Sequence, residues 1–250
     1  MGRKDDAFNY LKKGIVGGWN KKKIKKNKYL SKLQDYKEWK NIKKECKSQK
    51  KEFEASLNME VRKKVKKMFN RDQWKAFGAL FTFSFKGKDR YAEKKFASHS
   101  EKQMAILINI LEEYGYPGER LLGNGLWMTV ILSHHNSISL AYTQKDTIYP
   151  FLKPQLLEAI KKGEMSPYDY AIIEDWYITV KSDSKEVAYG YLNMLTEQKV
   201  PKSNKMRQNI GMRSIEIRNR LVDIQEKTGM DFYLAGSPWI QGKIAVNNKR

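Results

Sequence analysis

The stretch LWMTVILSHH, at residues 126–135, is the most apolar part of the chain and decides its fold. Apolar side chains lie on nearly every side of a helix drawn through it, a pattern that favours a central, fully buried helix. A buried strand has a similar pattern and stays open as an alternative. The run covers only about eight strongly apolar residues, whereas about 20 are needed to span a bilayer, so no integral membrane segment is expected.

Helix signals continue on both sides of this stretch. Ser98 and Glu101 form a predicted capping box, with Ser98 at the N-cap of a helix that ends at Gly115. Pro117 then prevents the helix from resuming. Residues 151–162 predict another helix, for which the glycine that follows supplies the stop.

Further along the chain, Ser166 followed by proline predicts the start of a helix that runs through residue 176. Residues 186–197 predict a weaker helix, and residues 206–227 a long one. The alternating phenylalanines of residues 79–85 form the only good strand candidate, a short strand or a hydrophobic loop. The sequence therefore predicts a mainly α protein with a helical bundle-like body and at most a minor strand element near 79–85.

Positive charge is concentrated at the N-terminal end. The chain has 49 Lys and Arg against 28 Asp and Glu, a net charge of +21. Residues 1–75 contain 25 basic and 9 acidic residues, a net charge of +16, which leaves only +5 for the other 175. Apolar residues from Leu30 to Met68 recur at spacings of three and four, which predicts one or two long amphipathic helices. We therefore expect a basic helical arm at 1–58, a helical core domain at 59–236 and a C-terminal tail at 237–250, frayed at its last five residues, 246–250.

Two lysine-rich clusters are the candidate binding residues. Such density attracts polyanions, which include nucleic acid, acidic lipid surfaces and acidic proteins. The plain alternative is a solvated helix face. Lysine outnumbers arginine and is the less selective phosphate ligand, so non-specific affinity is favoured over specific recognition. The clusters comprise Lys21, Lys22, Lys23, Lys25, Lys26, Arg62, Lys63, Lys64, Lys66 and Lys67.

Aromatic residues lie among these lysines. They have the right chemistry to stack on nucleic acid bases. Aromatics at helical spacing more often pack against the protein, so docking on the body is favoured. The residues concerned are Trp19, Tyr29, Tyr36 and Trp39.

The sequence offers few groups for metal or cofactor chemistry. One cysteine, Cys46, excludes an internal disulfide framework and a Cys-rich zinc module. No P-loop, dinucleotide glycine motif, nucleophile elbow or His-x-x-x-His pair is present, so no metal is predicted and no cofactor is indicated. The first residues lack the apolar region of a signal peptide, and a soluble cytoplasmic protein is expected.

Polar residues inside apolar helices are the candidate catalytic groups. His134 and His135 are adjacent, so on a helix they point about 100° apart and do not easily face one site. Glu174 and Asp175 lie mid-helix between apolar residues, where a buried carboxylate needs a partner. Paired with a histidine, such a carboxylate would orient a general base, although a structural ion pair between helices is the more common arrangement.

Six short motifs follow one another in an order that resembles the bacterial domain of unknown function 6624 family. They are Asp72-Gln73, Gly115-Tyr116-Pro117 through Gly123, His134 or His135, Gly163-Glu164 with Glu174-Asp175, Tyr189-Gly190, and Arg218 and Arg220 with Gly229-Met230. The resemblance spans about residues 60–234. Because the family has no established activity, it implies architecture more than function.

This chain departs from the family pattern at three places. Trp74 or Lys75 falls where the family has arginine, and Trp176 follows the acidic residue where arginine is usual. Tyr191-Leu192 replaces Thr-Gln. If those polar groups form a site in the family, the resemblance implies a weakened or altered site here.

Three functions remain as hypotheses. The first is a binding module whose basic arm contacts a polyanion or a protein. The second is a hydrolase-like enzyme whose candidate residues converge in one cleft of the helical core, and the third is peripheral attachment to an anionic membrane through the lysines. The candidate catalytic residues are Asp72, Gln73, His134, His135, Glu174, Asp175 and Tyr189.

Overall fold

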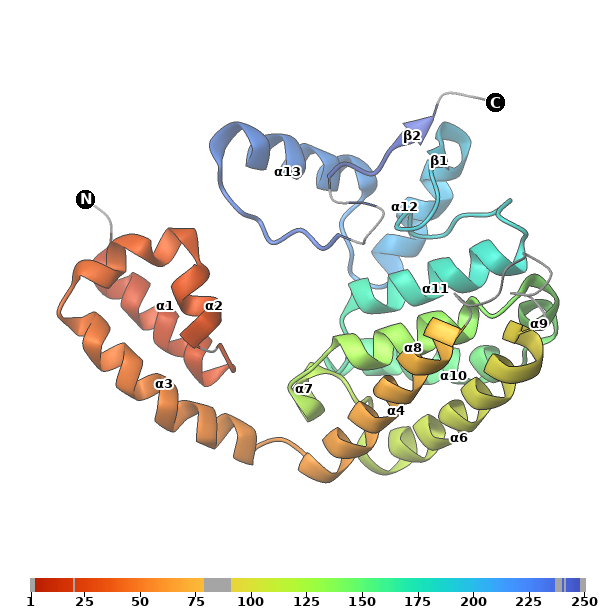
Figure 1. Cartoon of the computed structure of the whole chain (residues 1–250). Coiled ribbons are helices and arrows are strands. Elements are labelled where there is room, and N and C mark those ends of the chain that lie inside the picture. Colours follow the sequence, from red (N-terminus) through yellow and green to blue (C-terminus); the bar gives the residue numbers. More distant parts are fainter. Residues whose placement is uncertain (1–2, 20, 79–90, 237–239, 241, 248–250) are drawn as a thin grey trace. The chain divides into compact units, whose positions relative to one another are not determined.

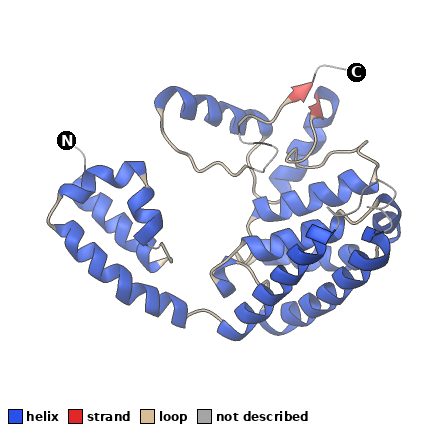
Figure 2. Ribbon diagram, viewed as in Figure 1, coloured by secondary structure: helices blue, strands red, loops and turns tan. Residues whose placement is uncertain are grey.

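The computed structural model describes residues 3–19, 21–78, 91–236, 240 and 242–247 (Figure 1). Helices dominate this part of the chain (Figure 2), which confirms the predicted mainly α fold. The strand expected at residues 79–85 lies outside the described residues. Contacts divide the chain into two compact parts, here called unit 1 (residues 1–62) and unit 2 (residues 63–250).

Unit 1 is a small helical unit with its own apolar core. Its elements are α1 (Lys4–Val16), α2 (Lys21–Lys26), the 3₁₀ helix η1 (Lys28–Asp35) and α3 (Glu38–Ala55). Helix α1 packs against α3, and η1 packs against α2 and α3. The buried core of the unit comprises Phe8, Leu11, Ile15, Ile24, Leu33, Trp39 and Ile42.

Two long helices, α3 with 18 residues and α4 (Met59–Gly78) with 20, cover most of the range from Leu30 to Met68, as predicted, whereas the chain before α3 folds in shorter segments. The chain turns after α1, where Gly18 has a φ of +94°. A Cβ at Gly18 would lie 2.8 Å from the Phe53 ring, so the turn requires glycine. The helical segments are short enough to fold back and bury Trp39 in the core of the same unit, whereas Trp19, Tyr29 and Tyr36 remain 36–46% exposed.

Unit 2 contains most of α4 and all the elements that follow it. These are α4 (Met59–Gly78), the π-helical turn η3 (Ala92–Phe96), α6 (Ala97–Tyr114), α7 (Glu119–Leu122), α8 (Leu126–Asn136), α9 (Leu140–Lys145), α10 (Ile148–Lys161), α11 (Pro167–Lys181), β1 (Leu195–Thr196), the 3₁₀ turn η4 (Glu197–Lys199), α12 (Val200–Asn209), α13 (Ile215–Thr228) and β2 (Val246–Asn247). None of the described helices combines the length and the apolar character that crossing a bilayer requires.

Helix α8 forms the centre of unit 2, as its apolar sequence predicts. It packs most extensively against α11 and also contacts α6 (Figure 1). Met128, Ile131 and Leu132 are completely buried. A helix with buried residues on several sides must be surrounded, which explains why the hydrophobic run tolerates so few polar positions.

Two predicted helix boundaries agree with the structure. The Ser166 side chain accepts a hydrogen bond from the Tyr168 N–H at 3.2 Å, and Pro167 is the first residue of α11. Gly115 ends α6 with a φ of +81°. Both signals are local, since a cap or a left-handed residue acts within one turn.

The capping box predicted at Ser98 is wrong. The helix is already formed at Ala92 through η3 and continues into α6. Phe96 and Ala97 are buried in a cluster with Ile138, so tertiary packing keeps the preceding turn helical. A tertiary contact of this kind overrides a capping preference worth about 1 kcal/mol.

Two predicted helices in the C-terminal third are also wrong in part. Residues 186–197 form bends and the strand β1, whose residue Leu195 pairs in parallel with Val246 of β2. The long helix predicted at 206–227 is broken at Gly211, which has a φ of +76°. The fraying predicted from residue 246 is wrong at Val246 and Asn247, which form β2 and pair with β1. Just before them, Ile244 is 2% exposed and belongs to a small apolar cluster.

Substitutions along α8 test whether its buried face holds unit 2 together. Leu132→Ala removes a side chain that is 0% exposed and is expected to lower the free energy of unfolding by about 2–5 kcal/mol. Leu126→Ala on the same helix removes a side chain that is 62% exposed and should change it by no more than about 0.5 kcal/mol. Urea unfolding followed by circular dichroism measures both, and equal effects would contradict a central position for α8.

Candidate functional site

A histidine–carboxylate pair joins α4 and α8. His134 Nδ1 lies 2.6 Å from Asp72 Oδ2, and Gln73 Nε2 donates to the same oxygen at 3.1 Å. The Asp72 side chain is completely buried, whereas the His134 side chain is 32% exposed. A buried carboxylate that accepts the Nδ1 proton fixes the ring and leaves Nε2 as the basic nitrogen. This is the geometry of an oriented general base.

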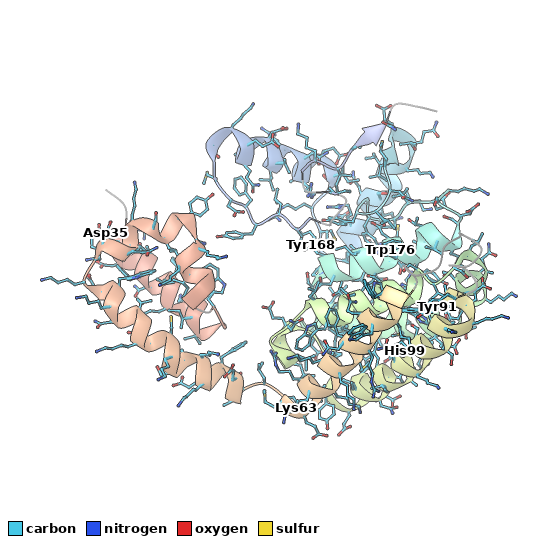
Figure 3. The ribbon with its side chains drawn as sticks, in the orientation of Figure 1. Asp35, Lys63, Tyr91, His99, Tyr168 and Trp176 are labelled. Carbon is cyan, nitrogen blue, oxygen red and sulfur yellow. The ribbon has the colours of Figure 1, made fainter. Side chains whose placement is uncertain are left out.

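A second histidine, His99 of α6, is labelled in Figure 3 and shares a ring contact with this pair. The ring of Phe96 contacts both histidines: its centroid lies 6.2 Å from that of His99 and 6.1 Å from that of His134. Burial lowers the pKa of His99, and the charge of Asp72 opposes this shift only in part. The sequence contains just three histidines, so His99 was a visible candidate, but only the fold brings it near Asp72.

The polar atoms around this pair are not all satisfied. Asp72 Oδ1 and His99 Nε2 are both buried and have no hydrogen-bond partner. Buried polar atoms normally have a partner, and an unpaired one costs about 1–3 kcal/mol. The described residues nevertheless contain no group of three ligating side chains placed to hold a metal ion.

His135 belongs to a different cluster. Its Nδ1 lies 2.9 Å from Ser100 Oγ, and its Nε2 lies 3.5 Å from Asp146 Oδ1. A ring protonated at Nε2 faces the carboxylate and accepts a hydrogen bond from the Ser100 hydroxyl. Ser100 is 0% exposed and His135 1%, so the hydroxyl cannot reach a substrate. The three side chains connect α6 and α8 to the start of α10.

Asp146 also caps α10. Its carboxylate accepts hydrogen bonds from the N–H groups of Ile148 and Tyr149 at 2.9 and 3.1 Å. Burial raises the pKa of Asp146, but His135 and these two N–H groups together outweigh burial and hold the pKa below its ordinary value. The ionised form is therefore the one that stabilises the fold.

Glu174 forms an interhelical network between α10 and α11. Its carboxylate accepts hydrogen bonds from the Tyr149 hydroxyl at 2.6 Å and from Lys153 Nζ at 2.5 Å. The Tyr170 hydroxyl lies 3.5 Å away. Glu174 is 1% exposed, whereas the Lys153 side chain is 39% exposed. This is the structural ion pair between helices that sequence reasoning kept as the plainer alternative.

Asp175 supports a loop. It accepts hydrogen bonds from the main-chain N–H groups of Ala188, Tyr189 and Tyr191 at 3.2, 2.6 and 2.6 Å. Burial raises the pKa of Asp175 to about 6, and the N–H groups offset that shift only in part. The side chain of Tyr189 turns toward Tyr170, with ring centroids 6.1 Å apart. Asp175 therefore positions the chain between α11 and β1.

The candidate catalytic residues thus fall into separate clusters. Asp72, Gln73 and His134 lie together, and Glu174 and Asp175 have partners of their own. Within the described part of the chain, no hydrogen bond or ion pair links Asp72 or His134 to either of those carboxylates. The predicted cleft was to hold Asp72, Gln73, one of the two histidines, Asp175 and Tyr189. Among the described residues, hydrogen bonds join the first three through His134, whereas Asp175 and Tyr189 form a separate contact.

Two buried arginines also lie near the loop that Asp175 supports. The guanidinium groups of Arg207 and Arg218 lie 5.4 and 6.0 Å from the centroid of the Tyr191 ring. The two residues are 1% and 3% exposed. They donate to main-chain carbonyls, those of Tyr189, Arg213, Ala235 and Gly242. These arginines therefore hold loops rather than carboxylates.

The basic residues divide between the two units. Residues 1–62 contain 19 Lys and Arg against 8 Asp and Glu, a net charge of +11. Lys25 and Lys26 are exposed, whereas Arg62 is half-buried. On α4, the predicted binding lysines are all exposed: Lys63, Lys64, Lys66 and Lys67. Lys21, Lys22 and Lys23 form the first turn of α2.

A lysine stripe on α3 was missed by reasoning from charge runs. Its members are separated by four, three and four residues, which places them on one face of the helix. All are exposed, and among the described residues none of them forms an ion pair with a carboxylate. The helical spacing was the signal that identifies Lys40, Lys44, Lys47 and Lys51.

No family model matches this sequence, and no curated protein or solved structure is detectably similar to it. The motifs behind the family resemblance do contact one another in pairs. Asp72 meets His134, and Glu164 Oε2 accepts a hydrogen bond from the Tyr116 N–H at 3.1 Å. Asp175 accepts from the Tyr189 N–H. The resemblance itself stays a prediction.

The pH dependence of stability tests the Asp146 cluster. A carboxyl whose pKa is lowered by folding stabilises the fold above its unfolded pKa, and this is lost as the pH falls through the folded pKa. Asp146→Asn should therefore reduce the free energy of unfolding at pH 7, with a difference from the native protein that shrinks below about pH 4. Urea unfolding between pH 3 and 7 measures this.

The exposed Glu113 on α6 provides the control for this experiment. Glu113→Gln should have an effect below about 0.5 kcal/mol throughout the pH range. An Asp146→Asn deficit that is the same at pH 3 and pH 7 would contradict a role for the ionised carboxylate.

Proposed function

We propose that this protein is a binding module that holds polyanions without sequence specificity, through the lysines of unit 1 and of α4. The observation that supports this most directly is the net charge of +11 on unit 1, a short segment with its own apolar core. A folded core keeps the lysines on the surface of ordered helices instead of a flexible tail. The positive field is therefore attached to a defined surface.

The α3 stripe supports the proposal geometrically. From Lys40 to Lys51 the helix rises about 16 Å, with a lysine every turn. Where a carboxylate of unit 1 forms an ion pair among the described residues, its partner is a basic residue outside the stripe, such as Lys4 for Glu38 at 2.6 Å. The stripe therefore keeps its charge for an external anion. Ammonium groups contact phosphates or sulfates as point charges, which supports affinity without recognition of sequence.

Heparin chromatography tests this function. Replacing Lys40, Lys44, Lys47 and Lys51 with glutamine should make the protein elute at a clearly lower salt concentration. It should also reduce the slope of log affinity against log salt by about 3 units, because each lost phosphate contact contributes about 0.7–0.9. Isothermal titration with a short polyanion at several salt concentrations measures the slope.

A matched variant controls for net charge. Lys102, Lys145, Lys162 and Lys205 are exposed lysines of unit 2, and their replacement with glutamine removes the same four charges. If this variant and the α3 variant elute at the same salt concentration, retention depends only on the net charge of the protein, and the α3 surface is not the binding surface.

A second candidate function rests on the Asp72–His134 pair. We infer that a partly exposed histidine oriented by a buried carboxylate can act as a general base in a hydrolase-like reaction. The 2.6 Å contact and the difference in burial between the two side chains favour a general-base role for His134. The neighbouring His99, whose pKa is lowered by burial, would supply a second neutral imidazole near the same surface.

Hydrolysis of nitrophenyl esters and phosphodiesters tests this candidate. If the pair is catalytic, His134→Gln and Asp72→Asn should each reduce kcat/KM by about 100-fold or more. The control Glu112→Gln, at an exposed position of α6, should leave it unchanged. Hydrolysis that persists in both variants, with the same pH profile as the native protein, would rule out this role for the pair.

A further inference from the structure

The outward face of α4 combines positive charge with exposed aromatic rings. Lys63, Lys67, Asn70, Trp74 and Phe77 are separated by four, three, four and three residues, so they share one face of the helix. All five are exposed, and Figure 3 labels Lys63 in the second turn. The opposite face is buried and consists of Val61, Val65, Met68 and Asp72.

Trp74 is the most unusual residue of this face. Its side chain is 76% exposed, although the same helix buries apolar residues on its other side. The Trp74 and Phe77 rings are perpendicular, with centroids 6.4 Å apart. With Asn70 and Gln73 they line a hollow of about 430 Å³, which is within the usual range for ligand sites. An exposed apolar surface of this kind indicates a binding site.

The charge around the hollow selects an anionic ligand. Lys66, Lys67, Arg71 and Lys75 are exposed on the same helix, within eight residues of Trp74 in the sequence. The only acidic residue between Lys63 and Gly78 is Asp72, which is buried against His134. No carboxylate on this part of the helix competes with an incoming anion. The ligand that fits must therefore carry negative charge and also offer a surface for an indole ring.

Single-stranded nucleic acid has both properties. Its unpaired bases stack on aromatic side chains, and its phosphates bind lysine and arginine. The amides of Asn70 and Gln73 can donate to and accept from base edges. A sulfated polysaccharide or an acidic peptide without aromatic residues would satisfy the charges but leave the Trp74 face unused. A base-paired duplex would hide the faces of its bases.

We propose that this face of α4 is a binding site for single-stranded nucleic acid, in which a base stacks on Trp74 and the flanking lysines hold the phosphates. The proposal rests on the proposed polyanion binding and specifies its ligand. It assigns a separate role to the aromatic side chains, which a purely electrostatic surface would not need.

The test uses the full-length protein and a fluorescently labelled 20-nucleotide oligothymidylate, with fluorescence anisotropy as the readout. Trp74→Ala should weaken binding at least fivefold, the lower end of the effect expected for one stacking interaction. Trp74→Phe should restore most of the affinity, because a phenyl ring also stacks. Salt-dependent elution from heparin should be the same for all three proteins, since no charge has changed.

Phe151 provides a matched control, because it is an exposed aromatic residue on α10 (57% exposed) without this basic surround. Phe151→Ala should change neither measurement. Circular dichroism checks the fold of every variant, and the exposure of Trp74 makes loss of folding by Trp74→Ala unexpected. The native protein should also bind the single strand at least fivefold more tightly than a duplex of equal length.

The outcomes separate this inference from the proposed function. Normal heparin binding with equal oligonucleotide affinity for the native protein and Trp74→Ala would overturn the α4 site and leave polyanion binding in place. Equal affinity for single strand and duplex would do the same, as would binding to anionic vesicles without binding to the oligonucleotide. If the native protein binds neither heparin nor the oligonucleotide, the proposed function itself is overturned.

Discussion

The burial of α8 is the constraint on which unit 2 depends. Its apolar residues place most of the helix in the interior, so the polar residues at its C-terminal end are carried inside and must find partners there. His134 pairs with Asp72 of α4, and His135 lies between Ser100 of α6 and Asp146. Asn136 donates to the Ile173 carbonyl of α11 at 2.9 Å. One helix end therefore determines where four surrounding segments lie.

This constraint also separates the structural polar groups from the functional candidates. Most buried ionisable side chains of unit 2 are engaged in holding loops or helices, as Asp175 holds the segment before β1. The Asp72–His134 pair differs because its imidazole is partly exposed. Helix α4 contributes Asp72 on its buried side and Trp74 with the lysines on its exposed side. The contacts on the buried side of α4 thus hold the helix, and with it the basic, aromatic face, in a fixed position.

Local signals in the sequence predicted some elements well and others badly. Ser166 marks the start of α11 because a cap and a following proline act within one turn. The capping box at Ser98 failed because burial of Phe96 and Ala97 extends the helix backward. The helix expected at 186–197 is replaced by a loop whose N–H groups donate to Asp175. No local sequence pattern predicts this partner, because it lies on another element. Local sequence propensity determines the secondary structure where tertiary contacts are weak. Where tertiary contacts are strong, they determine it instead.

The amino-acid sequence alone determined three properties: the chain is mainly helical, α8 is buried, and the N-terminal end of the chain is strongly basic. These properties depend on periodicity and composition, which are local or additive. Only the tertiary structure decided which polar side chains meet. Asp72 and His134 are 62 residues apart in the chain, and Ser100 and His135 are 35 apart. Hydrogen bonds and ion pairs act over a few ångströms, so their partners are selected by how the helices pack and not by their order in the sequence.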